Sequence, residues 1–177
     1  MRRLVLFRHA KADPRNHGTS LDHERTLTRR GRDDAPRIGR YLANADIVPD
    51  LALVSDSVRT KETFDLAQEA FGRPIPLRLE PAMYKADVPG LLQMVRKTND
   101  TLATLLLVGH NPEFAELAVE LTGQGEPDLL TQMRTKFPTA AVAVIDFDGD
   151  QWIEVGPRKG RLDAFVTPAA LGASHDE

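Results

Sequence analysis

Residues 101–123, TLATLLLVGHNPEFAELAVELTG, join the most apolar run of the chain to an amphipathic segment. The run 101–110 has the length and composition of a strand buried on both faces, which predicts a central strand. The segment 111–123 has apolar residues at helical spacing, with Pro112 at a tolerated early position and Gly123 past its end. A buried strand followed directly by a helix is the building unit of an α/β protein.

The same alternation of strand and helix runs through the rest of the chain. Further strands are predicted at 2–7, 50–55 and 75–80, and further helices at 28–45, 57–72 and 87–98. Thr28 and Asp87 are the expected N-caps of the first and third of these helices, and Gly72 is the expected end of the second. Asp148-Gly149 lies between two apolar-rich runs in 139–156 and predicts a hairpin.

These elements predict an α/β fold. We expect a single-domain three-layer sandwich, with a mostly parallel sheet, helices on both faces and a C-terminal antiparallel hairpin. The 177 residues, 41% of them hydrophobic, allow one core and are few for two. We therefore expect one domain over 1–170 and a flexible tail over 171–177, where the residues are small and polar.

The composition excludes several classes of protein. A net charge of -3 gives no general attraction for nucleic acid or for an anionic membrane. The lack of cysteine excludes disulfides, thiolate metal sites and a cysteine nucleophile. The first ten residues, MRRLVLFRHA, contain an apolar run too short for a signal peptide or a membrane span. We expect a soluble cytoplasmic protein, of undetermined oligomeric state.

Three of the predicted strands end at cationic or imidazole side chains. These side chains are Arg8 and His9, then Arg59, and then His110. Because the carboxyl ends of parallel strands meet at one edge of a sheet, we expect all four to lie together. Two guanidinium groups and nearby helix N-termini suit a phosphoryl group. The sequence thus predicts a phosphate site at this edge.

Four segments resemble, in order and spacing, the histidine phosphatase (phosphoglycerate-mutase-like) superfamily. They are LVLFRHAKA (4–12), LTRRGRDDA (27–35), SDSVRTKET (55–63) and LLLVGHNP (105–112). The first resembles the Arg-His signature, the second the Leu-Thr-x-x-Gly segment and the third the Ser-x-x-x-Arg-x-x-x-Thr pattern, while the fourth ends in the second histidine. The compact length and the form RHAKA are similar to the small SixA-type phosphohistidine phosphatases.

This resemblance implies a metal-independent phosphatase with His9 as the nucleophile, which forms a phosphohistidine intermediate that water then cleaves. It implies that Arg8, Arg59 and His110 bind the phosphoryl oxygens and stabilise the transition state, with no metal ion and no cofactor. His9 must then be neutral, with one ring nitrogen free and the other donating its proton to a backbone carbonyl. The neighbouring Arg8 disfavours the imidazolium form.

The chain departs from the fuller family pattern in three ways. Ala10 stands where glycine is usual, which requires a negative φ, and the extended signature is absent, with Ala12 and Arg15 at its Thr and Asn positions and Asn16 one residue late. The segment 78–90 lacks the glutamate motif that protonates the leaving group in mutases. Glu80 is the nearest candidate for a general acid, although its position is typical of a surface carboxylate at a strand end.

The missing acid bears on the substrate. An imidazole leaving group, with a reference pKa of about 6.5, is protonated easily, whereas an alkoxide needs a proton donor. We therefore expect the partner to be a protein phosphorylated on histidine. One alternative is a phosphatase of a small phosphorylated metabolite, a sugar phosphate or nucleotide, with an acid such as Asp13 or Glu113 at the site. A second is a non-catalytic phosphate-binding module, which would not need a nucleophile.

The long polar segment 10–26 is the only candidate lid or docking element. His17 and His23 within it are interpreted as solvated loop histidines and not as metal ligands. Because the stretches that roof the mutase-like active sites are short here, the resemblance implies an open site that admits a side chain of another protein. Arg134 and Lys136, just before the predicted hairpin, are interpreted as exposed loop charges, with the alternative that they face the phosphate site.

Overall fold

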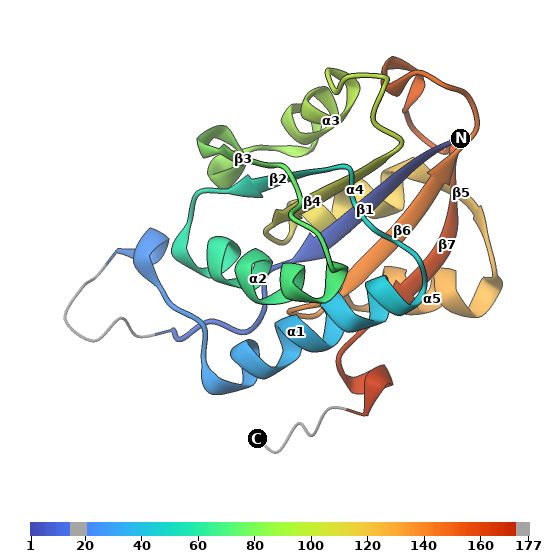
Figure 1. Cartoon of the computed structure of the whole chain (residues 1–177). Helices are drawn as coiled ribbons and strands as arrows, with labels where there is room; N and C mark the ends of the chain where they lie inside the picture. Colours follow the sequence, from blue (N-terminus) through green and yellow to red (C-terminus); the bar gives the residue numbers. More distant parts are fainter. Residues whose placement is uncertain (15–20, 173–177) are drawn as a thin grey trace.

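Seven strands form one sheet within residues 1–14 and 21–172, the part of the chain that this computed structural model describes (Figure 1). In chain order they are β1 (Arg2–Arg8), β2 (Leu51–Ser55), β3 (Leu77–Glu80), β4 (Thr104–Gly109), β5 (Thr122–Gly125), β6 (Val142–Phe147) and β7 (Gly160–Val166). Their order across the sheet is β3-β2-β4-β1-β6-β7-β5.

The sheet is mostly parallel, as the alternation of elements predicts. β1 lies in its middle, parallel to β4 and antiparallel to β6. β2 is parallel to both of its neighbours, β3 and β4. At the other end, β7 is antiparallel to β6 and parallel to the short edge strand β5. The carboxyl ends of β1, β2 and β4 therefore meet at one edge of the sheet.

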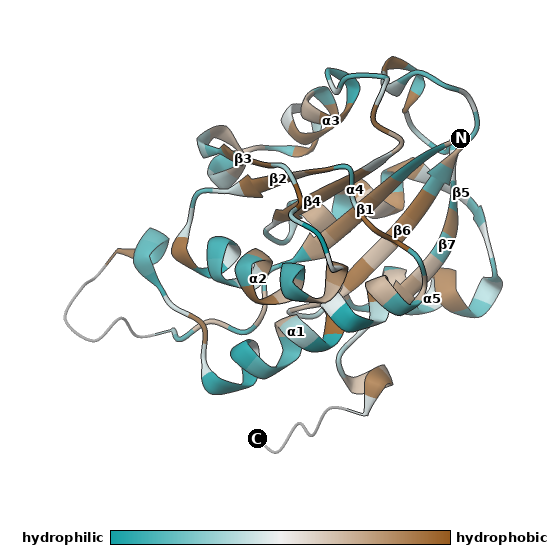
Figure 2. Cartoon of the chain, viewed as in Figure 1, coloured by the Kyte–Doolittle hydropathy of each residue, from teal (hydrophilic) through white to brown (hydrophobic). Residues whose placement is uncertain are grey.

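Helices cover both faces of the sheet, which confirms the three-layer prediction (Figure 1). They are α1 (Arg29–Asn44), α2 (Val58–Gln68), α3 (Val88–Arg96), α4 (Glu113–Leu121) and α5 (Pro127–Thr135). Val5 and Phe7 of β1 pack in a core with α1 and α2, whereas Leu4 and Leu6 pack in a second core with α3, α4 and α5. Alternate residues of one strand thus pack on the two faces, which explains the brown middle of β1 in Figure 2.

The predicted helix ends agree with the structure. The Thr28 hydroxyl accepts a hydrogen bond from the Gly31 N–H, and the Asp87 carboxylate accepts one from the Gly90 N–H. Gly72 has a φ of 71°, a left-handed conformation that closes the short 3-10 turn after α2. N-cap hydrogen bonds can be predicted from the sequence because they join residues only three positions apart.

The C-terminal hairpin forms, but its second strand lies later than the sequence predicts. Asp148-Gly149 does not lead straight into a strand; a 3-10 turn over Trp152–Glu154 follows, and β7 starts only at Gly160. The Trp152 ring is fully buried, and its N–H donates to the carbonyl of Leu102 at 2.8 Å. Burying a large aromatic ring with its donor satisfied outweighs the local tendency to continue as a hairpin.

One helix boundary and one whole helix differ from the predictions. The helix predicted over 111–123 ends at Leu121, because the chain turns there into β5 to pair with β7. α5 lies in a stretch for which no element was predicted. Pairing with a strand nearly forty residues away carries no local signal, so the sequence pattern alone does not reveal it.

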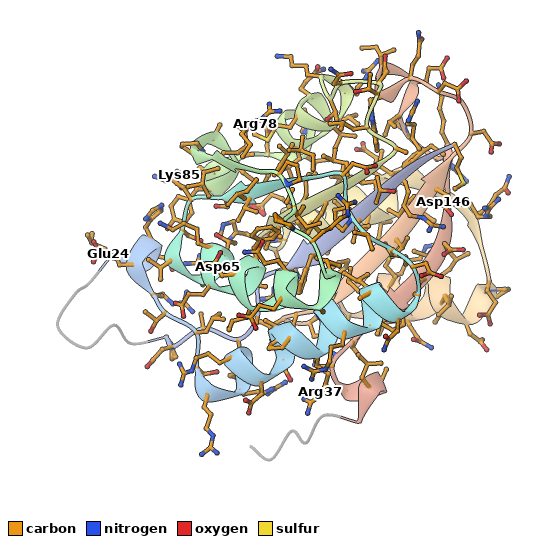
Figure 3. The ribbon with its side chains drawn as sticks, viewed as in Figure 1. Glu24, Arg37, Asp65, Arg78, Lys85 and Asp146 are labelled. Carbon is orange, nitrogen blue, oxygen red and sulfur yellow. The ribbon has the colours of Figure 1, made fainter. Side chains whose placement is uncertain are left out.

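An ion pair joins β1 to β6 far from the carboxyl ends of β1 and β4. The buried carboxylate of Asp146 on β6 accepts from Arg3 on β1 at 2.7 and 3.0 Å, and Arg161 lies 3.7 Å away (Figure 3).

Residues 15–20 and 173–177 lie outside the described residues, and with them Arg15, Asn16, His17 and most of the predicted tail. No helix of the described part is long and apolar enough to cross a membrane.

Candidate active site

Backbone hydrogen bonds fix His9 just past the end of β1. Its N–H donates to the carbonyl of Gly109 at 3.0 Å, and its carbonyl accepts from the N–H of Ala140 at 3.0 Å. The next residue, Ala10, donates to the Thr63 hydroxyl at 3.0 Å. Ala10 is not among the described residues with positive φ, so alanine is accommodated in place of the usual glycine. His9 is thus held from β4, from the segment before β6 and from α2.

The His9 ring has a defined tautomer. Its Nδ1 lies 2.7 Å from the carbonyl oxygen of Ala10. Because a carbonyl oxygen can only accept, Nδ1 carries the proton and Nε2 keeps its lone pair. The predicted backbone contact of the His9 ring is therefore present.

Arg59 and His110 lie beside His9, as predicted from the strand ends. The His9 and His110 ring centroids are 5.5 Å apart, and Arg59 Nη2 lies 3.4 Å from His110 Nδ1. Since arginine can only donate, His110 Nδ1 accepts, and its Nε2 donates to the Ser55 hydroxyl at 2.8 Å. Ser55, Arg59 and Thr63, the residues of the 55–63 motif, therefore each make a contact that positions this site.

Arg8 approaches the site from the other side of β1. Its Nη1 donates to the carbonyl of Phe137 at 3.0 Å, and the Asn111 side chain donates to the same carbonyl at 2.8 Å. The Phe137 carbonyl, which follows α5, thus fixes the guanidinium group of Arg8. The sequence pattern does not reveal this contact, because its acceptor is a backbone carbonyl in a distant segment of the chain.

Glycine is required where two backbone segments of the site meet their neighbours. A Cβ atom on Gly109 would lie 2.4 Å from the Phe114 ring, which packs on the end of β4. A Cβ atom on Gly31 would lie 2.2 Å from the carbonyl oxygen of Lys11. These close approaches explain why glycine stands in the 105–112 and 27–35 segments.

Burial keeps both histidines of the site neutral. It lowers the pKa of His9 to about 3, with smaller contributions from Arg59, His110 and Arg8 in the same direction. It lowers the pKa of His110 to about 4, again with Arg59 adding to the effect. Arg8 disfavours the imidazolium form of His9, as expected from the sequence, but removal of the ring from water is the larger cause.

A carboxylate from the segment 10–26 accepts a hydrogen bond from Arg59. Asp22 accepts from Arg59 Nη2 at 3.0 Å through its side chain and from Nη1 at 2.8 Å through its carbonyl. The Tyr84 hydroxyl and Arg25 Nη1 also donate to this carboxylate. The hydrogen bond from Tyr84 and the two arginines hold the pKa of Asp22 below its usual range, so the group is an anion. Asp22 and Tyr84 were not predicted as site residues.

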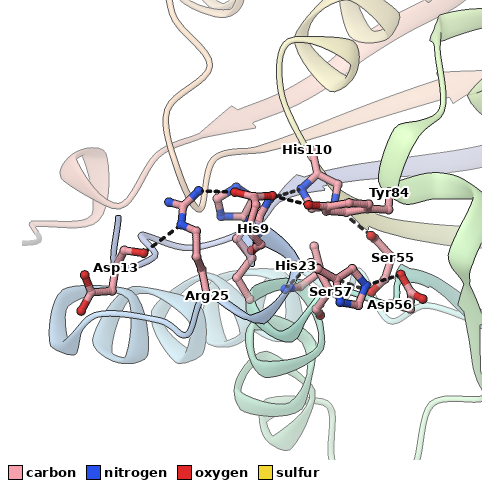
Figure 4. A network of polar contacts seen from close by, with 12 residues as sticks. His9, Asp13, His23, Arg25, Ser55, Asp56, Ser57, Tyr84 and His110 are labelled. Atoms are coloured by element: carbon pink, nitrogen blue, oxygen red, sulfur yellow. Dashed lines mark hydrogen bonds and ion pairs between the residues drawn. The ribbon is translucent and has the colours of Figure 1, made fainter. Parts of the chain in front are cut away.

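The site is buried, which differs from the open site that the resemblance implies, and Figure 4 shows His23 and Tyr84 close to its two histidines. His9 is only 7% exposed and Arg59 only 6%. The His23 ring packs edge-on against Tyr84, with centroids 4.8 Å apart, and its Nε2 lies 2.8 Å from the Asp56 carboxylate. The interpretation of His23 as a merely solvated residue is therefore wrong: it joins the segment before α1 to the loop after β2.

Comparison with known proteins identifies the family. Residues 4–105, more than half of the chain, match the histidine phosphatase superfamily (branch 1). An uncharacterized protein of Mycobacterium leprae is 31% identical over 165 residues, which cover 92% of this chain and 99% of that protein. The chain belongs to the histidine phosphatase superfamily.

Solved structures place this histidine phosphatase among the small members of the family. The crystal structure of a protein provisionally named phosphohistidine phosphatase SixA, from Agrobacterium tumefaciens, matches with a TM-score of 0.79 and 30% identity over 94% of this chain and 98% of that one. A protein named in the same way, from Nakamurella multipartitia, matches with a TM-score of 0.79 and 27% identity over 96% and 97%. Family and neighbours together support a phosphatase activity.

Glu80, the nearest candidate for a general acid in the sequence, has an ion pair with a side chain of its own strand. Glu80 ends the edge strand β3, and its carboxylate lies 3.8 Å from Arg78, which is labelled in Figure 3. Within the described residues its carboxylate has no hydrogen bond to His9, Arg59 or His110. The described residues also contain no group of three histidine, aspartate or glutamate side chains that could hold a metal ion.

The neutral state of the two histidines can be measured directly. Because their pKa values of about 3 and about 4 lie below the ordinary 6.5, both rings of the folded histidine phosphatase stay neutral from pH 8 to pH 5. The unfolded chain binds more protons than the folded one below pH 6.5, so the free energy of unfolding falls as the pH drops from there. An NMR titration should show no ring-proton transition of His9 above pH 5; a midpoint near 6.5 would contradict this account.

The carboxylate of Asp22 should compete with any oxyanion for Arg59. Replacing it by Asp22→Asn removes a negative charge beside the site, so inorganic phosphate should bind about tenfold more tightly. Calorimetric titration with phosphate measures this affinity. Glu24→Gln is the matched control, since Glu24 lies in the same turn, exposed and pointing outward in Figure 3, and should change nothing. Weaker binding by Asp22→Asn would show that Asp22 helps to bind the anion.

Proposed function

We propose that this protein is a metal-independent phosphatase that removes phosphate from phosphohistidine in proteins, with His9 as its nucleophile. The observation that carries the proposal is the tautomer of His9. A neutral ring with its proton on Nδ1 has its lone pair on Nε2, beside Arg59 and His110. A purely phosphate-binding module would not need a buried, uncharged imidazole between cations.

The reaction proceeds in two displacements. Nε2 of His9 attacks the phosphorus atom, the bond between phosphorus and the leaving nitrogen breaks, and that nitrogen takes a proton from solvent water. Water then attacks the phosphorus of phosphorylated His9, which releases inorganic phosphate and restores the neutral ring. The Ala10 carbonyl holds the Nδ1 proton throughout, so the ring keeps its orientation when Nε2 becomes bonded.

Arg8, Arg59 and His110 stabilise the charge on the phosphoryl oxygens. Phosphoryl transfer depends mainly on positioning and electrostatic stabilisation, for which two guanidinium groups and an imidazole suffice. Arg59 first exchanges the Asp22 carboxylate for the phosphoryl group, because both anions use the same donors. Desolvated guanidinium groups interact strongly with a dianion, which favours this exchange.

Two observations favour phosphohistidine over an alkyl phosphate. Glu80 lies against Arg78, so no carboxylic acid from the end of β3 is in contact with the reacting groups. An imidazole leaving group is protonated near neutral pH without such an acid, whereas an alkoxide is not. The names given to the two small structural neighbours agree with this substrate class.

Burial of His9 favours a second candidate, a phosphatase of a small phosphorylated metabolite. With only 7% of His9 exposed, a small phosphate ester reaches the ring more easily than a side chain fixed on a protein surface. The two candidates differ in the leaving group, so one set of substrates separates them.

Phosphate release in EDTA tests the proposal and separates the candidates. The purified protein is given a protein phosphorylated on histidine and, in parallel, phosphoserine, a sugar phosphate and a nucleotide monophosphate. We expect turnover of phosphohistidine that is at least a hundredfold faster in kcat/KM than that of the esters, and unaffected by the chelator. The His9→Asn variant should remain folded and lose at least a thousandfold in kcat, whereas Glu80→Gln should stay within about twofold.

Each contrary result has a definite meaning. Preferential hydrolysis of an ester with a loss in Glu80→Gln would establish the metabolite phosphatase. Activity in folded His9→Asn would overturn the mechanism. Loss of activity in EDTA would show that a metal ion takes part.

A further inference from the structure

A cavity of about 690 Å³ opens beside Arg8, away from the other residues of the proposed reaction. Of the four residues assigned to the phosphoryl group, only Arg8 lines it. Its walls come from the segment after β1, the start of α1, the end of α5 and the chain after β7. The lining residues are Arg8, Lys11, Arg30, Thr131, Gln132, Thr135, Lys136, Pro138, Thr139, Phe165, Thr167, Pro168 and Ala169.

The charge of this cavity has one sign. Arg8, Lys11, Arg30 and Lys136 line it, and none of its described lining residues is acidic. Arg30 lies 3.5 Å from Asp34, whereas neither lysine has an ion pair within residues 1–14 and 21–172. In a chain with a net charge of -3, four cations around one hollow make a local positive field that attracts anions.

Lys136 was interpreted from the sequence as an exposed loop charge. In the structure Lys136 comes directly after α5 and lines the same cavity as Arg8. The sequence alone does not bring α5 next to the end of β1, so the interpretation of Lys136 was incomplete. Arg134, its companion in that interpretation, is part of α5 and lines a different groove.

The remaining lining suits an organic anion. Phe165, Pro138 and Pro168 provide apolar surface, and the threonine side chains and Gln132 supply neutral hydrogen-bonding groups. Ligand sites of proteins typically have volumes of about 300–1,000 Å³ and combine apolar walls with a few polar groups. The cavity therefore has room for a carboxylate or phosphate together with the group that carries it.

Arg8 connects the cavity to the phosphoryl site. Its Nη1 is used by the Phe137 carbonyl, and its buried Nε has no hydrogen-bond partner among the described residues. A guanidinium group has five N–H donors in a planar fork, so it can serve anions on two sides. An anion in the cavity and a phosphoryl group at His9 would thus lie on two sides of the Arg8 guanidinium group.

We propose that this cavity is a second anion site, which binds a carboxylate or phosphate carried by the phosphorylated substrate itself. This inference rests on the proposed function and deepens it: the substrate has a second negative group within reach of Lys11 and Lys136. In a protein substrate that group is an acidic side chain near the phosphohistidine; in a small substrate it is a carboxylate or phosphate of the same molecule.

Matched substrates test the proposal in the Lys11→Gln/Lys136→Gln double variant. One pair consists of phosphohistidine peptides with aspartate or asparagine flanks, and the other of N-acetyl-phosphohistidine and its methylamide. For the aspartate peptide or the free carboxylate, KM should rise about tenfold in the double variant, with kcat unchanged. For the uncharged member of the same pair neither constant should change. The pair that responds identifies the source of the anion.

The control is Lys97→Gln, which removes an exposed lysine at the end of α3 and should alter neither pair. An equal rise in KM for the charged and the uncharged member of each pair, or no rise for any substrate, would overturn the proposal.

A titration with inorganic phosphate tests the cavity independently of catalysis. The backbone amide NMR signals of Thr135, Lys136 and Thr139 should shift in the wild type and stay fixed in the double variant. Shifts only at His9 and His110 would show that the cavity binds no anion while the phosphoryl site is intact. If the cavity amides shift but no phosphohistidine substrate is turned over, the second site stands and the proposed substrate fails.

Discussion

The hydrogen bond from His9 Nδ1 to the carbonyl of Ala10 is the contact on which the site depends. It fixes the tautomer, so the lone pair lies on Nε2, and it fixes the plane of the ring. The bond also stabilises a proton on the ring, and burial opposes a second one strongly enough to lower the pKa of His9 to about 3. An imidazole that is both oriented and uncharged, as the proposed nucleophile must be, follows from this one contact and from the burial of the ring.

The fold supplies the surroundings through the middle of its sheet. β1 lies between β4 and β6, so the backbone of His9 is bonded on one side to Gly109 and on the other to Ala140. β2, which pairs with β4, ends at Ser55, and the Ser55 hydroxyl accepts a hydrogen bond from His110. The helix α2 that follows contains Arg59. The two histidines therefore directly follow central strands and Arg59 lies in a helix, whereas Asp22, which bonds to Arg59, lies in a short 3-10 turn.

Parts of the site governed by strand ends and local motifs could be predicted from sequence. His9, Arg59 and His110 come together because each follows a buried parallel strand, a pattern visible in hydrophobicity alone. Asp22, Tyr84 and the Phe137 carbonyl could not be predicted, because their contacts join segments far apart in the chain and the last of them is a backbone acceptor. The same holds for Lys136, whose place beside Arg8 depends on an unpredicted helix, and for the late start of β7, which the burial of Trp152 causes.

The most direct test of the central claim is to find the phosphate on the enzyme. The protein is mixed briefly with a phosphohistidine substrate and quenched in base, in which phosphohistidine survives. The peptide that contains His9 is then examined by mass spectrometry. The account predicts one phosphate on His9 and none in the His9→Asn variant. Turnover without phosphorylation of His9, or phosphate on His110 instead, would contradict it.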